Sequence, residues 1–147
     1  MTRRQPASPP LGGETIAICA APELPQTLLE QLLTQRGYLT LRTSGQQEVR
    51  NVLAHALASA LILTASVPVA QSIDLCQNLR RDFPVIPIIA VLDPKDRARA
   101  ISLLESGADH YVIEPYKIET LLLTLTALSR HQRDKAGPAS RLRPLQF

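Results

Sequence analysis

Two short apolar stretches, each stopped by residues typical of turns, constrain the fold of this chain more than any other feature. The stretch Ser59–Pro68 passes through Ala-Leu-Ile-Leu before it reaches hydroxyl residues and a proline, and Val85–Leu92 is apolar throughout. Such runs are typical of strands buried on both faces, as at the centre of a parallel sheet. Functional groups of these sheets lie just past the carboxyl ends of the strands, so chemistry is expected at Thr64–Ser66. Only hydroxyl groups and an alanine stand there.

Helical patterns separate these stretches from three further strand-like segments. The spacing predicts strands at residues 15–20, 38–43, 59–64, 85–92 and 111–113. It predicts helices at residues 23–36, 46–57, 70–81 and 118–128, and a further helix between Asp93-Pro94 and Gly107. Strands that alternate with helices imply right-handed crossovers. The predicted fold class is therefore α/β, a doubly wound, five-stranded parallel sheet with helices on both faces.

Apolar spacing also predicts which side of each helix faces the core. The expected inward positions are Leu24, Leu28, Leu29, Leu32 and Leu33 in the first helix, Ala98, Ile101 and Leu104 in the fourth, and Ile118, Leu121, Leu125 and Leu128 in the last. These positions recur at the three- and four-residue intervals of one helix face.

Composition bounds the kind of protein this is. The chain has 147 residues, 45% of them hydrophobic, and no apolar run approaches the ~18 residues of a membrane span. We expect one soluble, cytoplasmic domain in which Cys19 and Cys76 are buried thiols in a reducing compartment. The spacing of the cysteines and histidines matches no metal site.

The net charge of +3 is unevenly distributed along the chain. Residues 14–129 carry 9 Lys or Arg against 12 Asp or Glu, so the basic excess lies in the two ends. We expect a disordered tail at residues 1–13, the domain at residues 14–131, and a basic linker or tail at residues 132–147. Contact of this tail with nucleic acid is the less favoured interpretation, because no aromatic residue or motif accompanies the charges.

Four phrases, in order, resemble the CheY-like receiver domain of bacterial response regulators over about residues 14–131. They are Leu32–Tyr38, Val67–Cys76, Phe83–Ile89 and Leu104–Tyr116. The resemblance implies a flavodoxin-like sheet with strand order 2-1-3-4-5. It also implies a cis peptide bond between Glu114 and Pro115.

The positions that carry the phosphotransfer chemistry of this family differ here. The resemblance places the two magnesium-binding acids at Ala20 and Ala21, the phosphoacceptor aspartate at Thr64, the hydroxyl switch residue at Leu92 and the lysine at Glu114. Only the aromatic switch position is kept, as Tyr111. All five catalytic positions have therefore changed.

These replacements remove the groups that magnesium and phosphate require. Mg²⁺ takes octahedral oxygen coordination, usually with carboxylates, whereas two alanines and a threonine offer at most one neutral ligand. Glu114 puts negative charge where a transferring phosphoryl group needs positive charge. A relocated acid pair of Asp93 and Glu114 is the alternative, but an acidic residue beside a proline is more often a helix cap. We expect no metal, no cofactor and no enzymatic activity.

The expected function is that of a pseudo-receiver, a regulatory module that transmits a signal by protein contact without aspartyl phosphorylation. By resemblance it acts in two-component or transcriptional control, alone or as the amino-terminal half of a longer regulator. DNA would then be bound only by a separate output domain. The alternative is a small-molecule sensor in which the vacated pocket, bounded by Ala20, Ala21, Thr64, Leu92 and Glu114, holds an apolar or cationic ligand.

The resemblance also suggests where a partner binds. Related receivers dimerise through the face of the fourth helix, fifth strand and fifth helix by charged pairs, and one arginine of that set falls on Thr124. Leucines outside the inward stripes stand on these elements. Leu103, Leu122 and Leu123, with Tyr111, form an exposed patch for self-association or a regulatory partner in one interpretation. In the other, a broad stripe packs deeper into the core.

Overall fold

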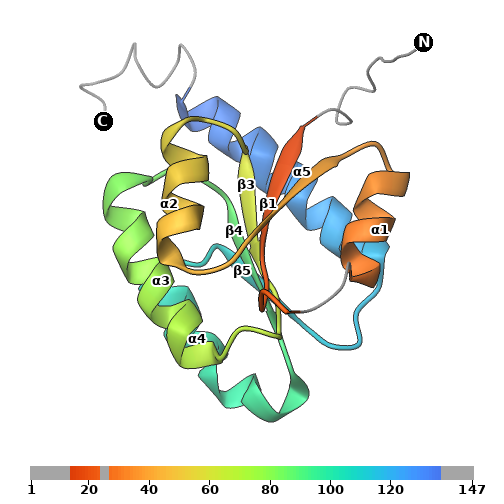
Figure 1. Ribbon diagram of the computed structural model, residues 1–147, viewed down its shortest axis with the longest axis vertical. Helices are drawn as coiled ribbons and strands as arrows, with labels where there is room; N and C mark the ends of the chain where they lie inside the picture. Colours follow the sequence, from red (N-terminus) through yellow and green to blue (C-terminus); the bar gives the residue numbers. More distant parts are fainter. Residues whose placement is uncertain (1–13, 24–26, 137–147) are drawn as a thin grey trace.

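Five parallel strands form a single sheet in the computed structural model, which describes residues 14–23 and 27–136. The strands are β1 (Thr15–Cys19), β2 (Leu39–Thr43), β3 (Ala60–Leu63), β4 (Ile88–Leu92) and β5 (His110–Ile113). Their order is β2-β1-β3-β4-β5, and every neighbouring pair is parallel (Figure 1). The predicted fold class and strand order are confirmed.

Helices cover both faces of this sheet, so the core has two halves. α1 (Leu28–Gln35) and α5 (Ile118–Ala136) pack on one face, while α2 (Gln46–Ala54), α3 (Val69–Asp82) and α4 (Ala100–Ser106) pack on the other (Figure 1). Residues of β3 and β4 point alternately into the two halves, and every residue of both strands is buried. The unbroken apolar runs in the sequence are the result of this two-sided burial.

Helix α1 begins later than its leucine pattern predicted. Thr27 is the N-cap: its hydroxyl accepts a hydrogen bond from the Glu30 backbone N–H at 3.2 Å, and a Glu30 carboxylate oxygen accepts one from the Thr27 N–H at 2.7 Å. This reciprocal capping box fixes the start of the helix. Leu29 and Leu33 face the core, whereas Leu28 is 69% exposed, so its predicted inward position is wrong. Leu24 lies outside the described residues.

The inward face of α4 also differs from the prediction. Ala100 and Leu103 are buried, and Leu103 is 0% exposed, whereas Ile101 is 68% exposed. Ala98 and Leu104 are exposed as well. Ala98 lies in η1 (Pro94–Arg99), a 3-10 helix that precedes α4, whereas Ile101 and Leu104 lie in α4 itself. The buried Ala100 and Leu103 have the same three-residue spacing, so the spacing alone does not decide which of the two sides faces the core.

One arginine holds together the end of the sheet where β4 and β5 begin. Arg80 of α3 donates hydrogen bonds to the carbonyl oxygens of Phe83, Pro84, Ile86 and Gly107 and to the Asp109 carboxylate. Gly107 has φ +127, and a Cβ there would lie 3.1 Å from the Cβ of Arg80. A glycine at this position therefore permits both the backbone turn and the close approach of α3.

The last helix follows its predicted stripe. Leu121 and Leu125 are buried, and Ile118 and Leu128 are partly buried against the same half of the core. α5 continues to Ala136, so the first residues of the expected linker, 132–136, are helical. The remaining residues of that segment, and the expected tail at 1–13, lie outside the described residues.

Two further sequence features are placed by the structure. Cys19 and Cys76 are free and buried, as predicted, and burial raises the pKa of the Cys76 thiol to about 12. No helix in the described part of the chain is both long and apolar enough to cross a membrane.

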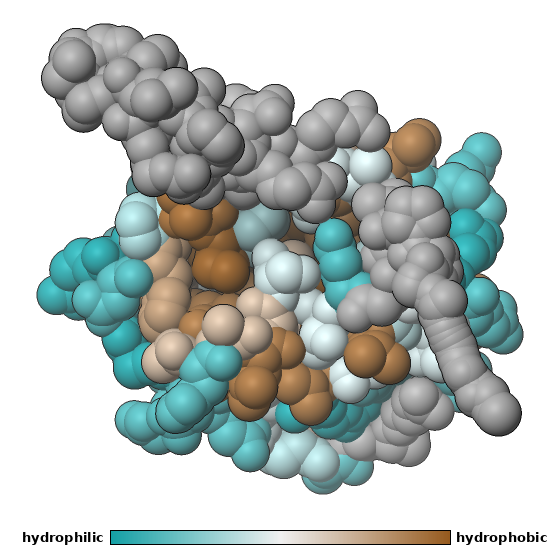
Figure 2. Space-filling view, turned by 90° about the horizontal axis from the view of Figure 1, so that it is seen from above, coloured by the Kyte–Doolittle hydropathy of each residue, from teal (hydrophilic) through white to brown (hydrophobic). Residues whose placement is uncertain are grey.

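Figure 2 looks onto the end of the domain where the strands begin, and the described apolar surface visible there is divided into separate areas.

Candidate functional site at the carboxyl ends of the strands

The five positions Ala20, Ala21, Thr64, Leu92 and Glu114 lie along the edge where the strands end, the lower edge of the sheet in Figure 1. Parallel pairing of β1 with β3, of β3 with β4 and of β4 with β5 brings these ends side by side. The prediction that they share one edge is therefore correct, but their side chains reach different surroundings.

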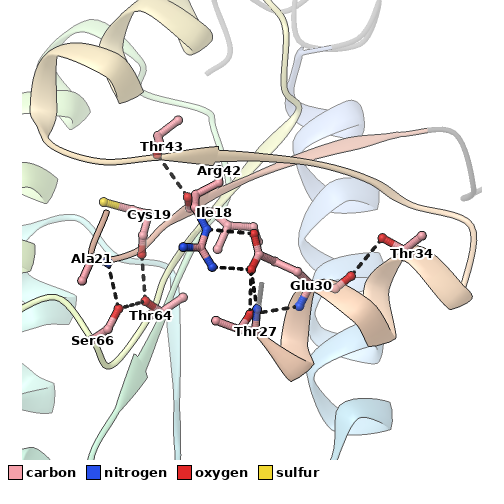
Figure 3. Close-up of polar contacts among 10 residues, drawn as sticks. All are labelled: Ile18, Cys19, Ala21, Thr27, Glu30, Thr34, Arg42, Thr43, Thr64 and Ser66. Atoms are coloured by element: carbon pink, nitrogen blue, oxygen red, sulfur yellow. Dashed lines mark hydrogen bonds and ion pairs between the residues drawn. The ribbon is translucent and has the colours of Figure 1, made fainter. Parts of the chain in front are cut away.

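A chain of hydrogen bonds ties the end of β1 to the segment after β3 (Figure 3). The Ala21 N–H donates to Ser66 Oγ at 3.0 Å, the hydroxyl oxygens of Ser66 and Thr64 lie 2.8 Å apart, and Thr64 Oγ1 donates to the Cys19 carbonyl oxygen at 2.9 Å. A carbonyl can only accept, so the Thr64 proton goes to Cys19 and the Ser66 proton goes to Thr64. In this hydroxyl chain both side chains use their protons inside the protein and offer only acceptor lone pairs outward.

The ends of β4 and β5 are arranged differently. Leu92 is buried, and its side chain packs among core residues under α2, α3 and α4. The Glu114 backbone N–H donates to the Leu92 carbonyl oxygen at 2.9 Å. The Glu114 residue itself is exposed, and its carboxylate makes no hydrogen bond or ion pair with any described residue. The Glu114–Pro115 peptide bond is cis, as predicted.

Asp93 is a helix cap rather than half of an acid pair. Its carboxylate accepts a hydrogen bond from the Lys95 backbone N–H at 2.9 Å, at the N-cap of η1. The capping interpretation is therefore confirmed. Among residues 14–23 and 27–136, no three His, Cys, Asp or Glu side chains are grouped so that they could hold a metal ion.

The single vacated pocket that the sequence predicted is divided in two. A cleft of 610 Å³ is lined by Thr64 and Glu114 and extends along α1. A second cleft of 500 Å³, lined by Ala20 and Ala21, opens between the starts of α2 and α3. Ser66 lines both clefts, and Leu92 lines neither. The prediction of one pocket bounded by all five positions is wrong, because the hydroxyl chain stands between its two parts.

The sequence is similar to those of response regulators. The probable transcriptional regulator ycf27 of Guillardia theta is 32% identical over 117 residues, which are 78% of this chain and 44% of that protein. The chain spans about half the length of the curated relatives it matches. No family model matches the sequence.

Two solved structures share the fold over nearly their whole length. The receiver domain of the TMAO respiratory system response regulator TorR is 27% identical, with a TM-score of 0.67 over 78% of this chain and 95% of that chain. This chain carries a CheY-like response regulator receiver domain. A CheY-like receiver domain protein from Methanospirillum hungatei JF-1 has a TM-score of 0.70 at 17% identity, over 84% of this chain and 98% of that chain.

The sequence did not predict that Ser66 links two strand ends at the carboxyl edge of this receiver domain. Its role depends on the hydrogen bond from Ala21, which lies 45 residues earlier in the chain. The only signal in the sequence is the pair of hydroxyl residues, Thr64 and Ser66, two positions apart after a buried strand. Side chains two residues apart after a strand can point the same way, but the sequence does not show their common partner.

A part-buried ion pair beside this edge was also missed. The Glu30 carboxylate of α1 accepts hydrogen bonds from Nε and a terminal nitrogen of Arg42 on β2, at 3.1 and 2.7 Å (Figure 3). The hydrogen bonds from Arg42, helped by those from Thr27, hold the pKa of the Glu30 carboxyl below its usual value. The Thr27-x-x-Glu30 capping signature was available in the sequence and would have placed the start of α1.

The four predicted switch or interface residues separate into three groups. Leu103 belongs to the core, so its predicted surface role is wrong. Leu122 and Tyr111 are partly buried and pack against opposite halves of the core. Leu123 is 72% exposed. Among the side chains that the structure describes, the large apolar ones exposed on this receiver domain's fourth and fifth helices are therefore Ile101, Leu104 and Leu123.

Proposed function

We propose that this receiver domain is a regulatory module that works without aspartyl phosphorylation and transmits its signal by protein contact. The observation that carries the proposal is Thr64 in its hydroxyl chain, because the family resemblance assigns that position to the phosphoacceptor. The names of relatives, a probable transcriptional regulator and a response regulator, support a role in two-component or transcriptional control. DNA binding would belong to a separate output domain.

The chemistry at the strand ends supports this proposal. An alcohol without a neighbouring base is a weak nucleophile, and the Thr64 proton is already donated to the Cys19 carbonyl oxygen. Ala20 and Ala21 provide no carboxylate for Mg²⁺, and the carboxylate of Glu114 repels a phosphate dianion. We infer that the module is not an enzyme and needs no metal.

We further propose that the module associates with a second copy through the side of the domain formed by α4, β5 and α5. β5 is an edge strand, and α4 and α5 pack beside it on opposite faces of the sheet, so the three elements share one side. We call this side the α4–β5–α5 face, and its two helices carry the exposed side chains Ile101, Leu104 and Leu123. Burying each of these side chains would contribute about 1.5 to 3 kcal/mol.

The outer surface of α5 has the composition of a contact surface. From Ile118 to Ser129 the only charged residue is Glu119, and it pairs with Arg36 at 3.2 Å at the end of α1. The exposed positions Thr120, Leu123 and Ala127 recur at helical spacing, and none is charged. A helix surface that remains in water usually carries charges, so an uncharged stripe favours an interface.

Exposure to a small phosphodonor tests the first part of the proposal. Incubation of the protein with Mg²⁺ and acetyl phosphate is expected to leave the mass, the melting temperature and the oligomeric state unchanged. A receiver domain that retains its phosphoacceptor aspartate serves as the positive control. A stable acyl phosphate on any aspartate of this chain would overturn the proposal.

Charge introduced on the α4–β5–α5 face tests the second part. Ile101→Arg and Leu123→Arg are expected to convert a dimer to a monomer in sedimentation equilibrium, with little change in melting temperature. Leu39→Arg is the matched control, since Leu39 is 60% exposed on β2 at the opposite edge of the sheet. A parent chain that is monomeric at every concentration, or a control that dissociates equally, would refute self-association.

A second candidate function is the sensing of a small molecule. The 610 Å³ cleft favours it, because the cleft reaches both Thr64 and Glu114 and has a mainly apolar lining. A ligand there would contact segments that follow β3 and β5, so sensing and self-association are compatible in one module.

A further inference from the structure

The 610 Å³ cleft is built from three segments that are distant in the sequence. Its walls are α1 with its N-cap, the residues that follow β3, and the residues that follow β5. Its volume lies within the range of clefts that hold small organic ligands. It has an apolar part along α1 and a polar end at the hydroxyl chain, and these two parts constrain what it can bind.

The apolar part would cover a hydrocarbon chain. Its apolar lining includes Leu28 and Leu32 of α1, Val91 of β4 and Ile118 of α5. Leu28 is far more exposed than the leucines that follow it in α1 and face the core. An apolar ligand in the cleft would remove the exposed Leu28 side chain from water, which favours binding.

The polar end accepts hydrogen bonds and carries negative charge. Thr64 and Ser66 use their protons within the hydroxyl chain, and the Thr27 hydroxyl donates its proton to the Glu30 carboxylate at 3.0 Å. The Glu114 carboxylate is exposed and free of partners among the described residues. No lysine, arginine or histidine occurs among the described residues of the lining.

An aromatic ring adds to the attraction for a cation. Tyr116 lines the cleft two residues after Glu114 and is half-buried. Burial, and then the charge of Glu114, raises the pKa of the Tyr116 phenol, so the ring stays neutral at physiological pH. Aromatic rings attract ammonium groups through the negative potential of their faces.

We propose that this cleft binds a small amphipathic molecule whose polar end is a protonated amine and whose body is a hydrocarbon. The ammonium would donate to Glu114, Thr64 and Ser66, and the hydrocarbon would lie over Leu28, Leu32 and Ile118. This inference rests on the second candidate function, sensing, and names the class of ligand. It predicts that the cleft discriminates against anions such as carboxylates and phosphate.

Three probes of equal chain length test the proposal on the full chain. Octylamine, octanol and octanoate are titrated separately below their micelle-forming concentrations, and binding is followed by isothermal calorimetry and by amide chemical shifts. Octylamine is expected to bind with one-to-one stoichiometry, at least tenfold more tightly than octanol, and to shift the amides of residues that line the cleft. Octanoate is expected to bind more weakly than octanol.

Two charge-neutralising variants locate the ammonium. Glu114→Gln keeps the shape of the side chain and should weaken octylamine binding about tenfold while it leaves octanol binding unchanged. Glu105→Gln is the matched control, since Glu105 is an exposed carboxylate of α4 outside the cleft, and it should bind octylamine like the parent. Leu123→Arg should also bind octylamine normally, so this test does not depend on self-association.

The possible failures are distinct. If none of the three probes shifts the cleft residues, small-molecule sensing at this cleft is refuted. If octanol or octanoate binds as tightly as octylamine, or if Glu114→Gln binds octylamine unchanged, the cleft binds apolar molecules but the assignment to amines is wrong.

Discussion

The carboxyl edge of the sheet and the α4–β5–α5 face differ in whether their side chains have partners within the protein. At the edge, Ser66 donates its proton to Thr64 and Thr64 donates its proton to the Cys19 carbonyl oxygen, so neither hydroxyl has a proton left for another molecule. On the face, Ile101 and Leu123 stand in solvent although apolar groups gain from burial. The comparison shows that the hydroxyl groups at the edge already have partners inside the protein, whereas the apolar groups of the face do not.

The same contrast exists within a single helix and provides the largest expected effect. Leu103→Ala should lower the free energy of unfolding by about 3 kcal/mol, since truncation of a fully buried leucine costs about 2 to 5 kcal/mol. Ile101→Ala, two residues earlier and exposed, should change it by less than about 0.5 kcal/mol. Urea denaturation followed by circular dichroism measures both. Equal losses would show that α4 presents a different face to the core.

The Glu30–Arg42 pair tests how far the polar groups beside the edge stabilise the fold. Glu30→Gln should destabilise the protein by about 2 kcal/mol at pH 7, because hydrogen bonds to buried charged groups are worth about 1.5 to 3 kcal/mol. The folded-state pKa of Glu30 is lowered, so its contribution is fully present above the unfolded pKa and is lost as the pH falls through the folded pKa.

Unfolding free energies of parent and Glu30→Gln should therefore differ at pH 7 and converge at acidic pH, below about 4. Glu119→Gln is the control: Glu119 pairs with Arg36 on the surface, and its loss should leave the melting temperature unchanged. A difference between parent and Glu30→Gln that stays constant with pH would mean that the pair owes its effect to packing.

The hydroxyl chain should show a smaller and non-additive effect. Ser66→Ala and Thr64→Val should each lower the free energy of unfolding by about 1 kcal/mol, the typical value of one hydrogen bond. Either change breaks the shared hydrogen bond, so the double variant should lose less than the sum of the two. Thermal and chemical denaturation of all four proteins completes the cycle, and additive losses would argue against a direct Ser66–Thr64 bond in solution.

The last variant is expected to show no change in phosphorylation. Thr64→Asp restores a carboxylate at the position that the resemblance assigns to the phosphoacceptor, yet Ala20, Ala21 and Glu114 remain. Without magnesium ligands or a nearby cation, this variant should gain no phosphoryl group from acetyl phosphate, as judged by intact mass. A phosphorylated Thr64→Asp protein would show that the single aspartate, and not its surroundings, limits the chemistry.

The fold was predictable because its strongest signals are local. The runs at Ala60–Leu63 and Ile88–Leu92 are apolar on both faces, and the breaks at Gly107 and Pro115 limit the elements between them. The orientation of α4 was not predictable from periodicity alone, because the buried Ala100 and Leu103 have the same three-residue spacing as the exposed Ile101 and Leu104. The spacing therefore allowed two inward faces for α4, and the predicted one was wrong.

The candidate site was predictable in position and not in structure. The resemblance located Thr64 and Glu114 at the correct edge, but the hydrogen bond from Ala21 to Ser66 divides the expected pocket, and it joins residues 45 positions apart. Contacts of this kind depend on the distance between strand ends. Sequence reasoning therefore placed the hydroxyl residues at the correct edge and missed the hydrogen bond that joins Ser66 to the end of β1.

Arg80 gives the two ends of the sheet different mechanical properties. Its guanidinium gathers carbonyls from the segments before β4 and β5, and the Asp109 carboxylate that it contacts also accepts the Ile88 N–H at 2.8 Å. The end where these strands begin is therefore held together by hydrogen bonds to one planar guanidinium, whereas the opposite end contains two clefts. We therefore expect conformational change in this domain to occur mainly at the end with the clefts.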